Sequence, residues 1–141
     1  MAIAYFDSSA FVKLLIEEDG SELSAALWDS CDAAVASRLA YPEVLAALRA
    51  AERADMLNPA GQRKAETMWE SFWGGTRPVE LTEQVAREAG RLANEHALRG
   101  PDAVHLASAL ALDDPEVLFA AWDQRLRDGV LAAGLHLAPA P

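Results

Sequence analysis

The stretch AIAYFDSSAFVKLL, residues 2–15, decides how the chain folds. It begins with an apolar run that ends at Phe6 and predicts a short buried strand, and a second apolar pattern with helical spacing follows Ser9. Asp7 stands at the junction between the two. Because Asp and Ser are favoured at turns and helix starts, Asp7 has a simple interpretation as a helix cap. Its other interpretation is a metal ligand, and the rest of the chain has to decide between them.

Strands and helices alternate along the remainder of the sequence. Short apolar runs predict strands at residues 2–6, 33–37, 77–81, 116–121 and 134–138. Helical spacing is found at residues 8–17, 21–31, 41–56, 59–72, 82–99, 102–112 and 123–133. This alternation predicts an α/β fold with a mostly parallel sheet covered by helices on both faces. Ligands bind outside the carboxyl ends of the strands in such folds, so Asp7 and Asp123 are expected at the functional edge.

Length and composition are those of one ordinary domain. The chain has 141 residues, of which 52% are hydrophobic. We expect residues 1–138 to form that domain and residues 139–141 to be a short frayed tail. No apolar run approaches the roughly 18 residues of a transmembrane helix and no leader pattern is recognisable, so a cytoplasmic protein without a membrane partner is expected. Cys31 is the single cysteine and has no internal disulfide partner.

The charge balance narrows the class of function. There are 22 acidic and 12 basic residues, and the net charge is −10. That balance argues against broad, sequence-independent binding of nucleic acid, which needs many Lys and Arg contacts to phosphate. It leaves open an enzyme that holds nucleic acid through metal ions, because such a site itself requires carboxylates. An acidic surface also favours a partner with a basic segment.

Position, not number, selects the candidate acids. Asp7 closes a strand, Glu43 and Asp102 each lie just inside a predicted helix after a proline, and Asp123 opens the last helix. Each has a structural interpretation, since an acid in the first helical turn meets the positive end of the helix dipole. If the four converge, however, two carboxylates about 5 Å apart repel by roughly 3 kcal/mol at an effective dielectric near 20. A converging set therefore predicts bound cations, and oxygen ligands suit Mg²⁺ or Mn²⁺.

Four blocks of the sequence resemble those of PIN domains, most closely the VapC toxins of toxin-antitoxin pairs: YFDSSAFVKLLIEE, ASRLAYPEVLAALRA, RGPDAVHLASALA and FAAWDQRLRDGVLAAGL. The resemblance spans essentially the whole chain, in the right order. It implies a PIN-like three-layer α/β/α sandwich and an endoribonuclease that depends on Mg²⁺ or Mn²⁺. It also implies a homodimer that a cognate antitoxin inhibits. The family's acidic quartet falls on Asp7, Glu43, Asp102 and Asp123, and its supporting hydroxyl falls on Ser9.

One position departs from the family pattern. Such proteins often carry Ser or Thr two residues before the last acid, where this chain has Ala121. The change puts in doubt a hydrogen bond that supports the site, but it removes no carboxylate. Two other functions therefore stay open. One is a PIN-like binding module without catalysis, and the other is a phosphohydrolase with Asp7 as nucleophile, although Ser9 then stands where such enzymes carry a second acid.

Several other polar or aromatic residues have structural interpretations. His105, three residues after Asp102, is expected to be a hydrogen-bonded histidine of the fold, and Trp122 is expected to pack in the core. Near the quartet acids in sequence stand three arginines, for which surface ion pairs are the simplest role: Arg38, Arg99 and Arg125.

Overall fold

Five parallel strands form the central sheet of the computed structural model, which describes residues 1–141. In sheet order they are β3 (Thr76–Val79), β2 (Ala33–Ser37), β1 (Ile3–Phe6), β4 (Leu118–Ala120) and β5 (His136–Ala138). Tyr5 of the central strand lies opposite Val35 on one side and Phe119 on the other. The α/β fold expected from the sequence is confirmed, and all four strand pairs are parallel.

The strand order explains where a site is expected. The chain moves outward from β1 to β2 and β3, and then returns to place β4 on the other side of β1. A crevice forms at the carboxyl ends of the strands where the direction of winding reverses. Asp7 directly follows β1, and Asp123 follows β4 after two residues. These two acids therefore border the switch point.

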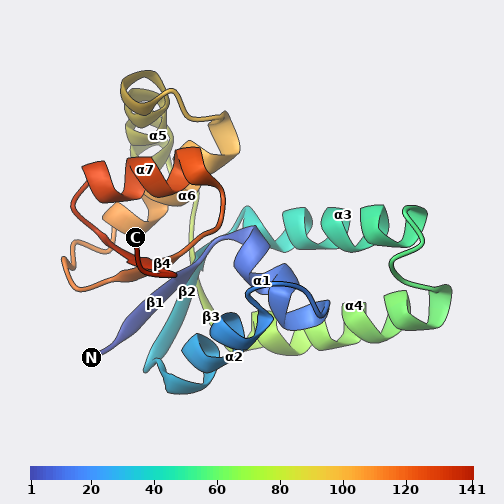
Figure 1. Cartoon of the computed structure of the whole chain (residues 1–141). Coiled ribbons are helices and arrows are strands. Elements are labelled where there is room, and N and C mark those ends of the chain that lie inside the picture. The colour runs from blue at the N-terminus through green and yellow to red at the C-terminus, as the bar shows by residue number, and fades with distance from the viewer.

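Seven helices cover the two faces of the sheet (Figure 1). They are α1 (Ser8–Leu15), α2 (Ser21–Ser30), α3 (Ala40–Arg53), α4 (Pro59–Gly74), α5 (Glu83–His96), α6 (Gly100–Leu110) and α7 (Gln124–Ala132). Helices α1–α4 lie on one face and α5–α7 on the other, and α3 and α4 extend side by side beyond the sheet. None of the helices has the length and apolar character needed to cross a bilayer.

Successive side chains of β1 point to opposite faces of the sheet, so the core has two layers. Tyr5 packs on the side of α5–α7, whereas Ala4 and Phe6 pack on the side of α1–α4. All three are buried, because a parallel sheet covered on both faces leaves no solvent side. The same arrangement holds the start of α1 tightly, since Phe11 is fully buried and its ring stacks on Phe6 at 5.2 Å.

The structure moves the boundary between two predicted helices. The helix expected at residues 82–99 ends at His96, because Ala97 takes a left-handed conformation with φ of 53°. The backbone N–H of Leu98 then bonds to the carbonyl of Ala93. The next helix starts at Gly100 instead of residue 102, with Pro101 in its first turn, where a missing N–H costs nothing. This early start places Asp102 inside the first turn of α6.

Gly20 provides a test of how the end of β4 is packed. Its φ is 94°, and a Cβ added to it would lie 2.8 Å from the ring of Trp122, the residue before Asp123. We expect Gly20→Ala to lower the free energy of unfolding by about 1–3 kcal/mol, because the backbone is strained and the indole must move. Thermal or urea unfolding measures this loss.

The matched control is Gly90→Ala. Gly90 lies within α5, and a Cβ there meets no atom within 4 Å. Replacing this helical glycine by Ala is expected to raise the free energy of unfolding by about 0.5–1 kcal/mol. A Gly20→Ala protein as stable as the wild type would contradict the packing of Trp122 described above.

Candidate active site

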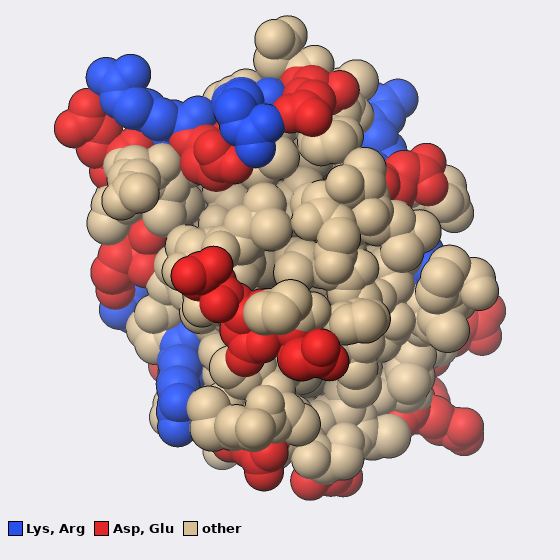
Figure 2. All heavy atoms as spheres, turned by 90° about the vertical axis from the view of Figure 1, so that its left-hand side faces the viewer, with Lys and Arg blue, Asp and Glu red and all other residues tan.

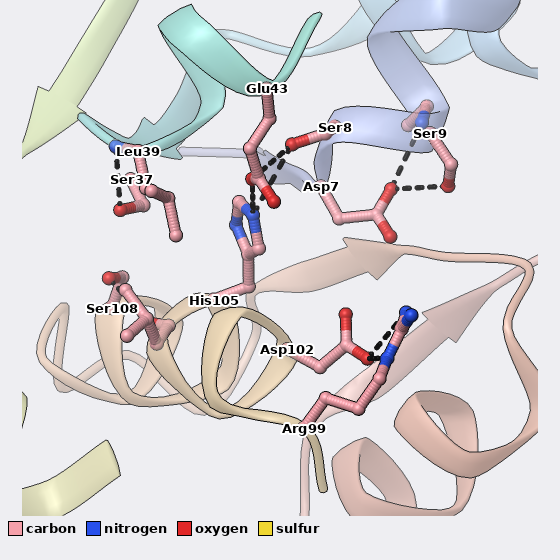
Figure 3. A network of polar contacts seen from close by, with 12 residues as sticks. Asp7, Ser8, Ser9, Ser37, Leu39, Glu43, Arg99, Asp102, His105 and Ser108 are labelled. Atoms are coloured by element: carbon pink, nitrogen blue, oxygen red, sulfur yellow. Dashed lines mark hydrogen bonds and ion pairs between the residues drawn. The ribbon is translucent and has the colours of Figure 1, made fainter. Parts of the chain in front are cut away.

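The four acids of the predicted quartet come from four different junctions. Asp7 caps α1, Glu43 and Asp102 lie in the first turns of α3 and α6, and Asp123 caps α7. The carboxylates of Asp7, Glu43 and Asp102 point toward one common space (Figure 3). Asp102 and Asp123 also line a surface depression of about 420 Å³. The structure thus gathers at one edge of the sheet residues that are up to 116 positions apart in the sequence (123 − 7).

Asp7 is the buried member of the set, with 6% of its surface exposed. Its Oδ1 accepts hydrogen bonds from the backbone N–H of Ala10 at 2.9 Å and from the hydroxyl of Ser9 at 2.7 Å. Both the cap and the Ser9 contact expected from the sequence are therefore present. Burial raises the pKa of Asp7 above its ordinary value and the negative charge of Asp102 adds to that rise, while the hydrogen bonds from Ser9 and Ala10 offset only part of it. A charged Asp7 is costly in the absence of a cation.

Glu43 is held from two sides at one oxygen. Its Oε1 accepts a hydrogen bond from the hydroxyl of Ser8 at 2.5 Å and lies 2.6 Å from Nε2 of His105. Burial by itself would raise the pKa of Glu43, but the hydrogen bonds from His105 and Ser8 outweigh it and lower the pKa. Glu43 is therefore a fixed, ionised carboxylate.

Arg99 carries the positive charge nearest the acids. Its guanidinium donates to Oδ2 of Asp102, with both Nε and one terminal nitrogen at 3.1 Å. The hydrogen bond and the charge of Asp102, followed by the charges of Asp123 and Glu43, raise the pKa of Arg99. The negative charges of these three acids therefore all stabilise the positive charge of Arg99.

The expected arginine ion pairs are confirmed at two positions and wrong at the third. Arg99 pairs with Asp102, and Arg38 pairs with Glu80. Arg125 makes no ion pair, and its guanidinium donates instead to the carbonyl of Ala97 at 3.5 Å. The left-handed turn at Ala97 is therefore the element that Arg125 contacts, a role that its position beside Asp123 in the sequence did not indicate.

The segment after β4 has Ala121 where related proteins often have Ser or Thr, and it carries the candidate acid Asp123. Asp123 is exposed, and its Oδ2 accepts from the backbone N–H of Leu126 at 3.0 Å. Ala121 is fully buried and offers only a methyl group. Trp122 is half-buried and packs against the core beside α1–α4, with the ammonium of Lys13 4.8 Å from its ring, so its expected packing role is confirmed.

The donor set fits a divalent cation in its chemistry. Each of the four carboxylates has one oxygen hydrogen-bonded to the protein and a second oxygen with no protein partner. None of these free oxygens is sealed from solvent, since the enclosed side-chain atoms without a partner belong to Ser24, Gln62 and Trp69. No three acidic, His or Cys side chains stand at the spacing of a single ion's ligands. Oxygen donors without partners are the ligands that Mg²⁺ and Mn²⁺ take.

One face of the molecule is drawn in Figure 2. On it, acidic side chains reach the centre, whereas Lys and Arg lie at the margin. This distribution agrees with the net charge of −10 and with the absence of a broad phosphate-binding surface on this face.

Comparison with known proteins identifies the family. The family model for the PIN domain matches residues 4–128. Two Mycobacterium tuberculosis proteins, Ribonuclease VapC45 of strain CDC 1551 and Ribonuclease VapC49 of strain H37Rv, are each 61% identical over 140 residues, which cover 99% of this chain and 97% of theirs. The chain therefore belongs to the PIN-domain family, within its VapC group.

Solved structures support the fold. The crystal structure of FitAcB from Neisseria gonorrhoeae matches with a TM-score of 0.70 and 18% identity, covering 95% of both chains. A toxin-antitoxin complex from Klebsiella pneumoniae matches with a TM-score of 0.55 and 17% identity, covering 82% of this chain and 83% of that one. At these identities the likeness shows the fold, and it confirms the expected PIN-like α/β/α architecture.

Sequence reasoning missed two residues of the site. His105 is 2% exposed and hydrogen-bonded, as expected of a histidine of the fold, but its contact with Glu43 was not anticipated. Ser8 lies beside Asp7 in the sequence, and no pattern there indicated that its hydroxyl donates to Glu43. The spacing of three residues between Asp102 and His105 was the one available signal, because it places both on one face of α6.

Proposed function

We propose that the protein is an endoribonuclease that depends on Mg²⁺ or Mn²⁺, and that Asp7, Glu43, Asp102 and Asp123 hold the metal. The observation that carries this proposal is the set of four carboxylates at the switch point of the sheet, each with a free oxygen. Two relatives at 61% identity that are named ribonucleases support RNA as the substrate.

The chain's own residues account for several parts of the reaction. Ser9 and the N-terminus of α1 fix one oxygen of the buried Asp7, and Ser8 and His105 fix one oxygen of Glu43. Ligands fixed in this way would hold a cation without a reorganisation cost. A divalent cation bound there would supply positive charge beside the scissile phosphate and a more acidic water for attack on phosphorus. The acidic cluster would otherwise repel RNA.

The family and the net charge support a proposal about the partners. We propose that the protein works in the cytoplasm as a homodimeric toxin and that a cognate antitoxin neutralises it. The structural likeness to a chain in a toxin-antitoxin complex supports such a partner. A net charge of −10 favours a basic segment in that antitoxin.

Removing the metal tests the proposal. We expect purified protein to cleave RNA in Mg²⁺, to lose at least about 100-fold of its rate in excess EDTA, and to recover when Mn²⁺ is added beyond the chelator. The matched control is Asp29→Asn, which removes an exposed acid of α2 and is expected to leave cleavage unchanged.

Two results would contradict the proposal. Cleavage that persists in EDTA and in Asp7→Asn would place the chemistry elsewhere. Absence of both cleavage and Mn²⁺ binding at millimolar concentration would favour a binding module.

A further inference from the structure

The environment of His105 contains a chain of hydrogen bonds whose direction can be worked out. The backbone N–H of Ser37, at the end of β2, donates to the hydroxyl of Tyr5 at 3.0 Å. The same hydroxyl lies 2.8 Å from Nδ1 of His105, and Nε2 of His105 lies 2.6 Å from Oε1 of Glu43. Tyr5 is fully buried and His105 nearly so. This series of hydrogen bonds therefore connects the centre of the sheet with a carboxylate of the candidate site.

The direction follows from which groups have protons to give. The ionised carboxylate of Glu43 only accepts, so Nε2 of His105 carries the proton of that contact. The oxygen of Tyr5 accepts from the backbone N–H of Ser37, and its own proton faces Nδ1 of His105. Burial raises the pKa of Tyr5, which keeps that proton in place. Nδ1 of His105 is then the acceptor, and the imidazole proton is on Nε2, directed at Glu43. With the opposite tautomer, a lone pair of His105 would face the carboxylate of Glu43.

The consequence concerns the orientation of Glu43. Ser8 and His105 both donate to Oε1, so this oxygen is fixed and Oε2 remains free. Figure 3 shows the Glu43 carboxylate between His105 and the space that Asp7 and Asp102 also face. Two donors at one oxygen stabilise the ionised form, which is the form that binds a metal.

We propose that Tyr5 and His105 are positioning residues: the Tyr5 hydroxyl holds His105 in its neutral Nε2–H tautomer, and His105 orients Glu43 as a metal ligand. The part that concerns Glu43 rests on the proposed metal site, whereas the tautomer depends only on the contacts of the fold. The sheet thereby fixes a site residue of α3 through a strand residue and a residue of α6.

The tautomer is tested first, on the metal-free wild-type protein. Long-range ¹H–¹⁵N spectra at neutral pH distinguish the two ring nitrogens, and the signals of His105 are assigned by their loss in His105→Gln. We expect a protonated Nε2 and an unprotonated Nδ1. A protonated Nδ1 would overturn the proposal, because Tyr5 would then have to donate elsewhere, toward the nearby Ser108 hydroxyl.

Variants test the positioning role through the dissociation constant for Mn²⁺. We expect His105→Leu to weaken Mn²⁺ binding about tenfold, the usual effect of losing a group that orients a ligand. His105→Gln should bind Mn²⁺ nearly as well as the wild type, because its amide keeps an N–H for Glu43. Tyr5→Phe should weaken binding less than His105→Leu does.

The matched control is Thr76→Val. Thr76 is buried at the start of β3 and its hydroxyl donates to the carbonyl of Phe72 at 2.9 Å, so the variant loses one buried hydrogen bond that does not belong to the series from Ser37 to Glu43. Its affinity for Mn²⁺ should not change. An equal loss in Thr76→Val and Tyr5→Phe, or a folded His105→Leu protein with wild-type affinity, would overturn the positioning role.

The same titrations separate this inference from the proposed function. If Asp7→Asn loses Mn²⁺ binding and His105→Leu binds Mn²⁺ like the wild type, the positioning role is contradicted and the metal site stands. Mn²⁺ binding that is unchanged in both Asp7→Asn and His105→Leu contradicts the metal site itself.

Discussion

We expect Asp7→Asn to lower the rate of RNA cleavage by about 10³-fold or more, which corresponds to about 4 kcal/mol in the activation free energy. Asn keeps the oxygen that accepts from Ser9 and Ala10, so α1 remains capped. What it loses is the charge that a cation requires. A cleavage assay with excess Mg²⁺ measures the effect, with Asp29→Asn as the control.

The same variant is expected to be more stable than the metal-free wild type at neutral pH. Burial raises the pKa of Asp7, so the folded protein holds a proton there more tightly than the unfolded chain does. The metal-free wild type therefore loses stability as pH rises through this raised pKa. Asp7→Asn lacks that loss, and its advantage should vanish below the ordinary value of 3.8, where Asp7 is protonated in both states.

Unfolding experiments across this pH range provide the measurement. Saturating Mn²⁺ should make the wild type more stable than Asp7→Asn, because the ion stabilises only the protein that binds it. Equal stability of the two proteins at neutral pH, with catalysis lost, would contradict the electrostatic cost assigned to Asp7 and leave its role in catalysis intact.

The second large effect is expected in the core. Phe11→Ala should lower the free energy of unfolding by about 3–5 kcal/mol, since the ring is fully buried and its neighbours are large aromatic side chains that cannot close the cavity. Its centroid lies 5.2 Å from that of Phe6 and 4.8 Å from that of Trp69. Phe11 therefore joins α1, whose first turn carries Ser8 and Ser9, to the sheet and to α4.

Thermal unfolding measures this loss, which should lower the midpoint by about 10–20 °C. The control is Phe72→Ala in α4, where the same side chain is only half-buried, so a clearly smaller decrease is expected. Equal decreases in the two variants would contradict the central place of Phe11 in this layer of the core.

Much of the fold could be predicted because its signals are local. The apolar run before Asp7, the helical spacing after it and the alternation of such segments imply a parallel sheet, whose carboxyl edge collects the acids. The end of α5 was harder, because Ala97 adopts a left-handed conformation usually signalled by Gly or Asn.

The candidate site was predictable in its members and not in its internal contacts. Glu43 and His105 are 62 residues apart, and only the folded chain brings them to 2.6 Å. Tyr5 has the periodicity of an ordinary core residue, and nothing in the sequence indicates that its hydroxyl connects Ser37 with His105. Contacts of this kind depend on how three elements pack, which a pattern along one chain does not encode.

The most direct test of the metal site is the anomalous diffraction of crystals equilibrated with Mn²⁺. We predict a peak bounded by Asp7 and by at least one of Glu43, Asp102 and Asp123, absent from crystals of Asp7→Asn. If no anomalous peak is found beside these carboxylates at saturating Mn²⁺, or if Mn²⁺ binds only elsewhere on the protein, their assignment as metal ligands is contradicted.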